Sequence, residues 1–189
     1  IGVAMELSGR FVAYGSSGKR GAEFALDVYG DKVAGMPIEL VVRDLQSDPQ
    51  ATVSTFNELV NGIGINYIIG PIASPIVAAA IPTWRQKRPI WIVPGSSSTT
   101  LEREIGDQPE FFHTFPYAYH YHQSLVSALV EQVGSDKTVG IVYSDDNYGQ
   151  AHLPYLKASL EKAGMKVVAE EVIRTNSSDM NPVLTRIAR

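Results

Sequence analysis

Two loops of the chain are rich in hydroxyl side chains and glycine. Each loop follows a short apolar run, the first at residues 67–70 and the second at residues 90–93. The first loop ends in Ser74-Pro75, and the second is Pro94-Gly95 followed by five hydroxyl residues at 96–100. If the two runs are parallel neighbouring strands, both loops lie at the carboxyl edge of one sheet, where open α/β folds bind ligands. Hydroxyls, free amides and a helix N-terminus at that edge favour a small anion such as a carboxylate.

Each of these features also has a plainer interpretation. Ser74 fits the N-cap of a helix whose first turn holds Pro75, and a capping hydroxyl can at the same time face a ligand. The run at 96–100 fits a flexible polar loop, but its position behind Pro94-Gly95 at a sheet's carboxyl edge favours binding. Ser96 and Ser97 therefore join Ser74 and Gly95 as candidate binding residues.

Composition limits the class of protein. The chain has 189 residues with 44% hydrophobic content and a net charge of −4, which indicates a globular protein with one sizeable core or one domain and part of another. An isoelectric point near 5.6 argues against a nucleic-acid partner, and no apolar run reaches membrane-spanning length. The absence of cysteine excludes disulfides, thiolate catalysis and zinc-thiolate sites.

Strand and helix patterns alternate along the first part of the chain. Strands are predicted at 1–7, 38–43, 67–70, 90–93 and 111–115, with helices at 16–29, from Asp48-Pro49 onward, and at 74–87. This alternation predicts an α/β fold with a doubly wound parallel sheet. The buried helix faces are expected to consist of residues at helical spacing: Gly18, Ala22, Ala25, Leu26 and Tyr29 in the first helix, Val53, Phe56, Leu59, Val60 and Ile63 in the second, and Leu125, Val126, Leu129 and Val133 in a later one.

The second part of the chain repeats this plan. Strands are predicted at 138–143 and 166–173, with helices at 149–163 and 179–189, and Tyr148-Gly149 stands where the first part has Tyr14-Gly15. We therefore expect two Rossmann-like lobes, an N-terminal ligand-binding lobe at 1–119 and the first part of a second lobe at 120–189. The second lobe has only two strands, so we expect it to be incomplete in this chain and the native molecule to continue beyond it.

Several short motifs in this order and spacing resemble the type I periplasmic solute-binding proteins of ABC transporters, of the leucine/isoleucine/valine-binding kind. The resemblance covers essentially the whole chain, and its motifs are Ile1-Gly2-Val3, Ser8-Gly9, Tyr14-Gly15, Gly21-Ala22-Glu23, Asp48-Pro49, Ile69-Gly70-Pro71 with Ser74, Pro94-Gly95 with its hydroxyls, Phe112-His113-Thr114 and Asp146-Asn147-Tyr148-Gly149. It implies a bilobed, non-catalytic receptor that closes on a small solute and delivers it to a membrane permease.

The resemblance also implies roles for individual residues. Ser74 would hydrogen-bond a ligand carboxylate, Gly95 would offer backbone groups, and the Ser97 hydroxyl would complete the clasp. Tyr14 would cover the ligand side chain, and Tyr148 would close on it from the second lobe. The acidic residue that pairs with an amino-acid ammonium in that family falls beyond position 189.

The ligand expected from the resemblance is a branched-chain or aromatic amino acid or a related small carboxylate. The stretch at 111–122 is unusually aromatic, with His113 where relatives often have arginine, which argues against an aliphatic ligand and leaves room for an aromatic or other organic acid. No cofactor or metal is expected, because His120 and His122 are two residues apart and make a poor metal pair on a helix. A structural or solvated role is expected for both.

The resemblance places the protein in the periplasm or outside the cell, as a mature exported protein that does not insert into the membrane. The alternative function is a ligand-sensing domain of a receptor, or an amide or organic-acid sensor, with the same bilobed fold. A phosphate-loop function is disfavoured, because Ala13 stands where its first glycine should be and Arg20 follows Lys19.

Overall fold

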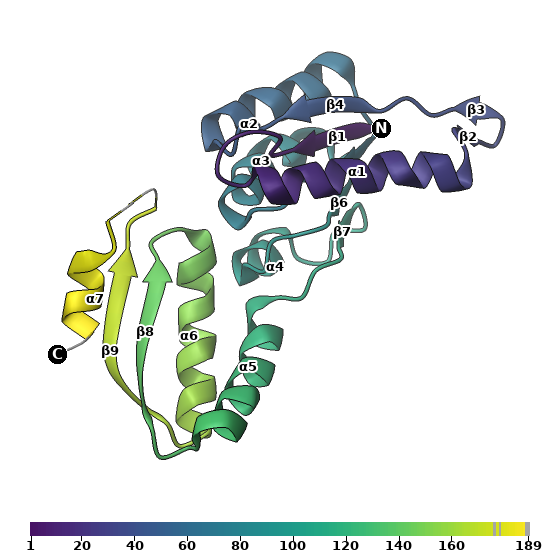
Figure 1. Ribbon diagram of the computed structural model, residues 1–189. Coiled ribbons are helices and arrows are strands. Elements are labelled where there is room, and N and C mark those ends of the chain that lie inside the picture. Colours follow the sequence, from purple (N-terminus) through teal and green to yellow (C-terminus); the bar gives the residue numbers. More distant parts are fainter. Residues whose placement is uncertain (176, 178, 188–189) are drawn as a thin grey trace. The chain divides into compact units, whose positions relative to one another are not determined.

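The computed structural model describes residues 1–175, 177 and 179–187 (Figure 1). The chain forms two compact units. Unit 1 comprises Ile1–Ser96 and Leu101–Phe115, and unit 2 comprises Ser97–Thr100 and Pro116–Arg189. The predicted lobe boundary near residue 119 stays a prediction.

Unit 1 is built on a five-stranded parallel sheet with the order β4-β1-β5-β6-β7. Its strands are β1 (Gly2–Met5), β4 (Val41–Asp44), β5 (Tyr67–Ile69), β6 (Ile90–Val93) and β7 (Phe111–His113). The strand order reverses between β1 and β5, so this sheet is doubly wound, as predicted, and its switch point lies between these two strands.

The helices connected to this sheet are α1 (Val12–Tyr29), α2 (Pro49–Asn57), the π-helix η1 (Glu58–Ile63), α3 (Ser74–Lys87) and α4 (Thr99–Ile105). Helix α2 begins as predicted, because the Asp48 carboxylate accepts the Ala51 amide at 2.8 Å and Pro49 occupies the first turn. The Ser74 cap was predicted wrongly. Ala73 is the N-cap of α3, and its own side chain makes no capping hydrogen bond.

Four aromatic rings form the centre of unit 1. The Trp91 ring lies 5.5 Å from each of the rings of Phe56, Trp84 and Phe111, all centroid to centroid. Trp91 comes from the middle of β6, while Phe56 and Trp84 come from α2 and α3. The Trp91 indole N–H donates to the carbonyl oxygen of Gly70 at 2.6 Å, which ties β6 to the loop after β5.

The predicted helix faces are partly wrong. In α2 and η1, Phe56, Leu59 and Val60 are buried as expected, but Thr52 is buried where Val53 was expected, and Ile63 is exposed. The residues that face the sheet are at positions 52, 56, 59 and 60, so position 53 lies on the outer side of the helix. In α1, Tyr29 is 85% exposed.

The predicted strand at 38–43 is shorter and is preceded by a hairpin. Strands β2 (Lys32–Val33) and β3 (Met36–Pro37) pair antiparallel around a two-residue turn. Both turn residues have left-handed backbones, with φ of 51° at Ala34 and 79° at Gly35, as short hairpin turns require. Gly35 therefore belongs to this hairpin turn, whereas Gly30 ends α1, with its amide donating to the Leu26 carbonyl oxygen.

Unit 2 contains α5 (Ala118–Val133), β8 (Thr138–Ser144), α6 (Asn147–Lys162), β9 (Lys166–Ile173) and α7 (Asn181–Ile187). β8 and β9 form a parallel pair, with α6 and α7 on opposite sides of it (Figure 1). The core is formed by Val126, Ile141, Leu160 and Met165. On α5, the predicted face residues Leu125 and Val133 are exposed, because this helix packs on α6 through a narrower stripe that contains Val126. The predicted end of the last helix, at 188–189, falls outside the described residues.

Candidate functional site

The loops after β5 and β6 share the carboxyl edge of the unit 1 sheet. The two strands are parallel neighbours in a register that pairs Ile68 with Trp91, so the chain leaves both strands at the same edge. Gly95 brings the loops into close approach, because a Cβ at this position would lie 2.6 Å from the backbone oxygen of Ile72. The predicted meeting of these loops is therefore confirmed.

Two of the predicted residues touch at this edge. The Ser96 hydroxyl donates to the Ser74 hydroxyl across 3.1 Å, and both side chains are buried. The backbone of Ser96 is left-handed, with φ of 67°, a conformation that is strained for a residue with a side chain. The loop thus holds the two hydroxyls together at a conformational cost.

Only some of the backbone amides at this edge already donate a hydrogen bond. Within the described residues, the N–H groups of residues 95–98 donate no hydrogen bond. The Ile72 and Ala73 amides, in contrast, donate to the Glu6 carboxylate at 3.2 and 2.8 Å. The loop after β6 therefore keeps amide donors for an anion, whereas the two amides just before α3 are already used by a carboxylate of the protein itself.

Glu6 is a buried carboxyl group that the sequence analysis did not single out. It follows β1 directly, and its side chain is fully buried. Burial raises the pKa of Glu6, while the hydrogen bonds from the Ala73 and Ile72 amides oppose that change, and the charge of Asp44 adds to it. The available signal was an acidic residue at the end of an otherwise apolar strand.

His113 holds the loop after β6 from the neighbouring strand. Its ring nitrogen Nε2 lies 2.9 Å from the Gly95 carbonyl oxygen and 2.6 Å from that of Ser96. Both partners are acceptors, so Nε2 carries the proton and donates to them. Pairing of His113 with Val93 in the β6–β7 register places the imidazole there, and this contact could not be read from the sequence.

Ser97 belongs to unit 2. Its carbonyl oxygen accepts the Ala118 amide at 2.8 Å, at the start of α5, and its hydroxyl lies 2.5 Å from Nε2 of His152 on α6. His152 Nδ1 in turn lies 2.8 Å from His122 Nε2. His122 is buried, which agrees with the structural role, one of the two roles expected for it.

The two predicted tyrosines lie in different units. Tyr14, in unit 1, is 63% exposed and occupies the first turn of α1. Tyr148, in unit 2, is 49% exposed, and its ring lies 4.2 Å from that of His152. Contact of either ring with a ligand stays a prediction.

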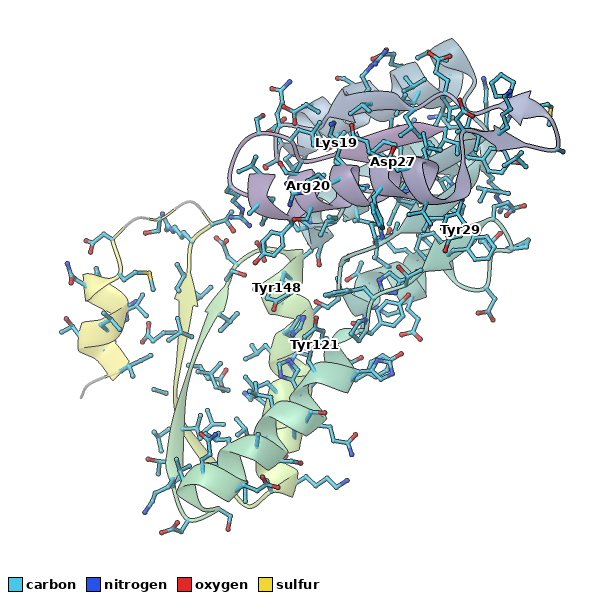
Figure 2. All side chains as sticks on the ribbon, turned by 45° about the vertical axis from the view of Figure 1, so that its right-hand side comes forward. Lys19, Arg20, Asp27, Tyr29, Tyr121 and Tyr148 are labelled. Atoms are coloured by element: carbon cyan, nitrogen blue, oxygen red, sulfur yellow. The ribbon has the colours of Figure 1, made fainter. Side chains whose placement is uncertain are left out.

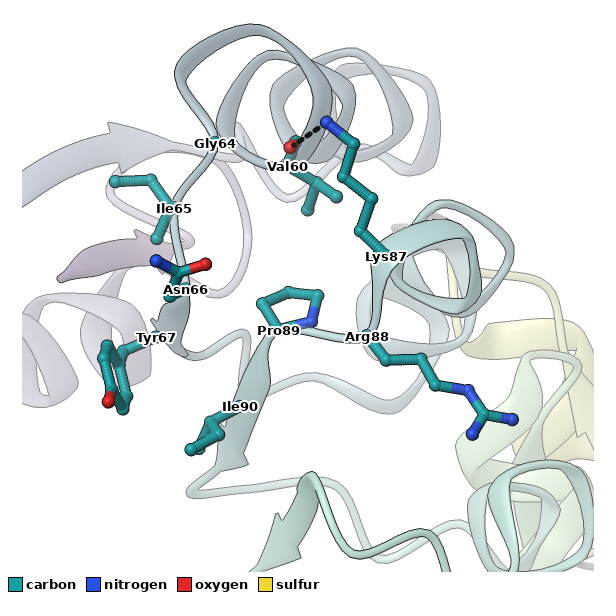
Figure 3. Close-up of a pocket in the computed structure, with 9 residues that line it drawn as sticks. All are labelled: Val60, Gly64, Ile65, Asn66, Tyr67, Lys87, Arg88, Pro89 and Ile90. Carbon is teal, nitrogen blue, oxygen red and sulfur yellow. Dashed lines mark hydrogen bonds between the residues drawn. The ribbon is translucent and has the colours of Figure 1, made fainter.

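A hollow of about 390 Å³ lies at the other edge of the unit 1 sheet (Figure 3). Its lining includes Tyr67 and Ile90, which are the first residues of β5 and β6, and also Lys87 and Arg88. Ligands of open α/β sheets bind at the opposite, carboxyl edge. We therefore assign the candidate site to the loops after β5 and β6, which we call the serine loops, and not to this hollow.

The described residues contain neither a metal-binding cluster nor a membrane-spanning helix. No group of three or more His, Asp or Glu side chains there is arranged to hold a metal ion. Every helix in that part of the chain is too short or too polar to cross a lipid bilayer.

A family model described as periplasmic binding protein matches residues 1–189. A leucine-, isoleucine-, valine-, threonine- and alanine-binding protein of Pseudomonas aeruginosa is 23% identical over 191 residues, which cover 100% of this chain and 50% of the relative. A Leu/Ile/Val-binding protein of Rhizobium johnstonii is 25% identical, with 99% and 50% covered. The chain spans about half the length of the curated relatives it matches.

Solved structures share the fold. A solute-binding protein of an ABC transporter from R. palustris, in complex with benzoate, matches 99% of this chain and 51% of its own with a TM-score of 0.87 and 22% identity. The substrate-binding protein of a branched-chain amino acid transporter from Streptococcus pneumoniae, in complex with isoleucine, matches 99% and 53% with a TM-score of 0.82 and 22% identity.

Proposed function

We propose that this chain, which belongs to the periplasmic binding protein family, is part of a solute-binding protein that captures a small carboxylate for an ABC transporter. The ligand class is a branched-chain or aromatic amino acid or a related organic acid. Isoleucine and benzoate, which are bound by two proteins of the same fold, both carry a carboxylate.

The observation that carries this proposal is the donor set at the carboxyl edge of the unit 1 sheet. The Ser74 and Ser96 hydroxyls lie in contact, and the amides of residues 95–98 make no hydrogen bond within the described residues. A carboxylate only accepts hydrogen bonds, so it matches a set of hydroxyl and amide donors better than a neutral or cationic group does. The strained backbone of Ser96 supports a binding role, since such strain clusters at ligand sites.

The remaining candidate residues complete the proposed site. Gly95 contributes backbone donors at the point where the two loops approach, and Ser97 contributes the next hydroxyl along the chain. Tyr14 and Tyr148 are proposed as aromatic walls, because such side chains dominate the lining of ligand pockets. Two rings suit an aromatic acid as well as an aliphatic one.

The same proposal covers location, partner and chemistry. The protein works in the periplasm or outside the cell and delivers its ligand to a membrane permease, and the ligand leaves unchanged because the protein is not an enzyme. Native mass spectrometry of the purified protein tests these points together. A co-purified acid recovered at its original mass supports the proposal, and a converted product contradicts it.

Ser74→Ala and Ser97→Ala test the site. Each substitution removes a hydrogen bond to a charged group, so each is expected to weaken the binding of isoleucine or benzoate by about 1 to 3 kcal/mol in calorimetric titrations. Ser54→Ala, at an exposed position of α2, is the matched control and should leave affinity unchanged. Unchanged affinity in both site variants would refute the assignment.

A further inference from the structure

Three buried polar side chains of unit 2 are joined in one row of hydrogen bonds. Ser97 Oγ lies 2.5 Å from His152 Nε2, and His152 Nδ1 lies 2.8 Å from His122 Nε2. Exposure is 1% for Ser97, 7% for His152 and 6% for His122. We call these three residues the serine–histidine row. It ends in His122 Nδ1, a buried nitrogen with no hydrogen-bond partner among the described residues.

Two tyrosines pack against the central ring of the row. The rings of Tyr148 and Tyr121 lie 4.2 and 5.8 Å from that of His152, centroid to centroid. Figure 2 shows these tyrosines on helices α6 and α5. The ring of His152 is thus contacted by those of His122, Tyr121 and Tyr148.

Both histidines of the row are neutral at pH 7. Burial lowers the pKa of His122, and burial together with the charge of His122 lowers the pKa of His152 to about 4. A neutral imidazole has one N–H and one bare nitrogen. The two facing nitrogens therefore share a single proton, which leaves two arrangements of the row.

The two arrangements differ in which buried group lacks a partner. If His152 Nδ1 carries the shared proton, His122 must be protonated at Nδ1, and that buried N–H has no acceptor. If His122 Nε2 carries it, Nδ1 of His122 is bare, and the unsatisfied group is an acceptor. Buried N–H groups without an acceptor are the rarer defect in proteins, so the second arrangement is favoured.

The favoured arrangement directs every proton of the row toward Ser97. His122 Nε2–H donates to His152 Nδ1, and His152 Nε2–H donates to Ser97 Oγ. The oxygen of Ser97 is then engaged as an acceptor, and its own hydrogen is available to another acceptor. In the opposite arrangement the Ser97 hydrogen is used on His152, and Ser97 presents only lone pairs, which repel a carboxylate.

We propose that His122 and His152 are positioning residues that keep the Ser97 hydroxyl a hydrogen-bond donor and so select for a carboxylate ligand. Neither histidine needs to touch the ligand. The inference rests on the proposed function, because it takes Ser97 to contact the bound acid. It adds a specificity device that depends on two residues outside the serine loops.

Nitrogen NMR of the wild-type protein with ¹⁵N-labelled histidine tests the direction of the row, because protonated and bare ring nitrogens resonate far apart. We expect Nε2 of both His122 and His152 to carry the proton and both Nδ1 atoms to be bare, in the free protein and with benzoate. A proton on His152 Nδ1 would overturn the proposal. This measurement needs no variant.

A double-mutant cycle with benzoate tests whether His152 acts through Ser97. His152→Phe is expected to weaken binding about tenfold when Ser97 is present and less than twofold in the Ser97→Ala protein. An equal loss in both backgrounds overturns the proposal, and His120→Phe, at an exposed position of α5, is the control. If His152→Phe does not fold, His152→Gln replaces it.

The two proposals fail in different ways. Wild-type protein that binds neither benzoate nor isoleucine would contradict the proposed function, and the nitrogen spectra of the free protein would still decide the direction of the row. Binding with a bare His152 Nε2 would leave the proposed function standing and would refute the positioning role.

Discussion

The first strand–helix turn of unit 1 and that of unit 2 are alike in backbone and different in chemistry. In both, a Tyr-Gly pair lies at the start of the helix, and the glycine packs closely against the backbone at the end of the strand. A Cβ at Gly15 would lie 2.0 Å from the Glu6 carbonyl oxygen, and one at Gly149 would lie 2.0 Å from that of Ser144. The side chains of Glu6 and Ser144, however, are a buried carboxyl and a half-buried hydroxyl.

The polar contacts of the two turns differ accordingly. Glu6 reaches out of its own turn to the Ile72 and Ala73 amides, whereas the Ser144 hydroxyl stays local and donates to the Asp146 carboxylate at 2.7 Å. The Asp146 carboxylate also caps α6. Close backbone approach thus sets the shape of both turns. The side chain beneath the glycine binds a distant loop in the first turn and a neighbouring residue in the second.

The largest effect is expected from substitutions that disrupt the close backbone approach shared by the two turns. Gly15→Ala and Gly149→Ala should each destabilise the protein by about 3 kcal/mol or more, because the added methyl group meets backbone atoms that cannot rotate away. Native-state hydrogen exchange would show the loss in unit 1 for the first variant and in unit 2 for the second.

Gly21→Ala is the matched control on α1, since a Cβ there meets nothing within 4 Å. It should stabilise the protein by about 0.5 to 1 kcal/mol through helix propensity. Equal effects of the substitutions at positions 15 and 21 would contradict the close approach in the first turn.

An intermediate effect is expected from substitutions of the two side chains that differ between the turns. Glu6→Leu leaves the Ile72 and Ala73 amides without an acceptor and should lower the free energy of unfolding by about 2 to 4 kcal/mol in denaturant titrations. Ser144→Ala removes one local hydrogen bond and should lower it by about 1 kcal/mol. Glu6→Gln keeps one acceptor oxygen and should fall between the two. A larger loss from Ser144→Ala would reverse the comparison.

A pH dependence of opposite sign is expected in the two units. The lowered pKa of His152, about 4, means that the unfolded chain binds a proton below pH 6.5 while the folded chain does not, so stability falls by about 2 kcal/mol between pH 7 and pH 5. The raised pKa of Glu6 means that the folded chain holds its proton above pH 4.5, so this group lowers stability as pH rises through that window.

Hydrogen exchange in each unit as a function of pH checks this prediction. His152→Gln should flatten the acid side of the unit 2 profile, and Glu6→Gln should remove the corresponding slope in unit 1. His120→Gln, at an exposed position, is the control and should change neither profile. A unit 2 stability that is constant between pH 7 and pH 5 would contradict a buried, neutral His152.

Local patterns predicted most of the element types. The strands β6 and β9 have the predicted bounds, because a short apolar run between Pro89 and Pro94, and a valine-rich run between Met165 and Arg174, have few alternatives. The helix start at Asp48-Pro49 was equally local. The predicted faces of α1 and α5 were less accurate, since spacing alone does not say how wide a stripe the neighbouring elements cover.

The candidate site likewise has features that local sequence predicted and features that it did not. Hydroxyl and glycine content pointed to Ser74, Gly95, Ser96 and Ser97, because residues that end parallel neighbouring strands must share an edge. Nothing in the sequence connected Ser97 to His152, which lies 55 residues away, or His113 to the carbonyl oxygens of the loop before it.

The sequence by itself determined the order of strands and helices, the two repeated turns and the polar edge, because these follow from the spacing of apolar residues, glycine and proline along a few neighbouring positions. Only the tertiary structure decided which polar groups are already paired. Glu6 fills the start of α3, and His122 and His152 form a row with Ser97. Hydrogen bonds between distant residues depend on where packing brings the chain together, and local spacing does not encode that position.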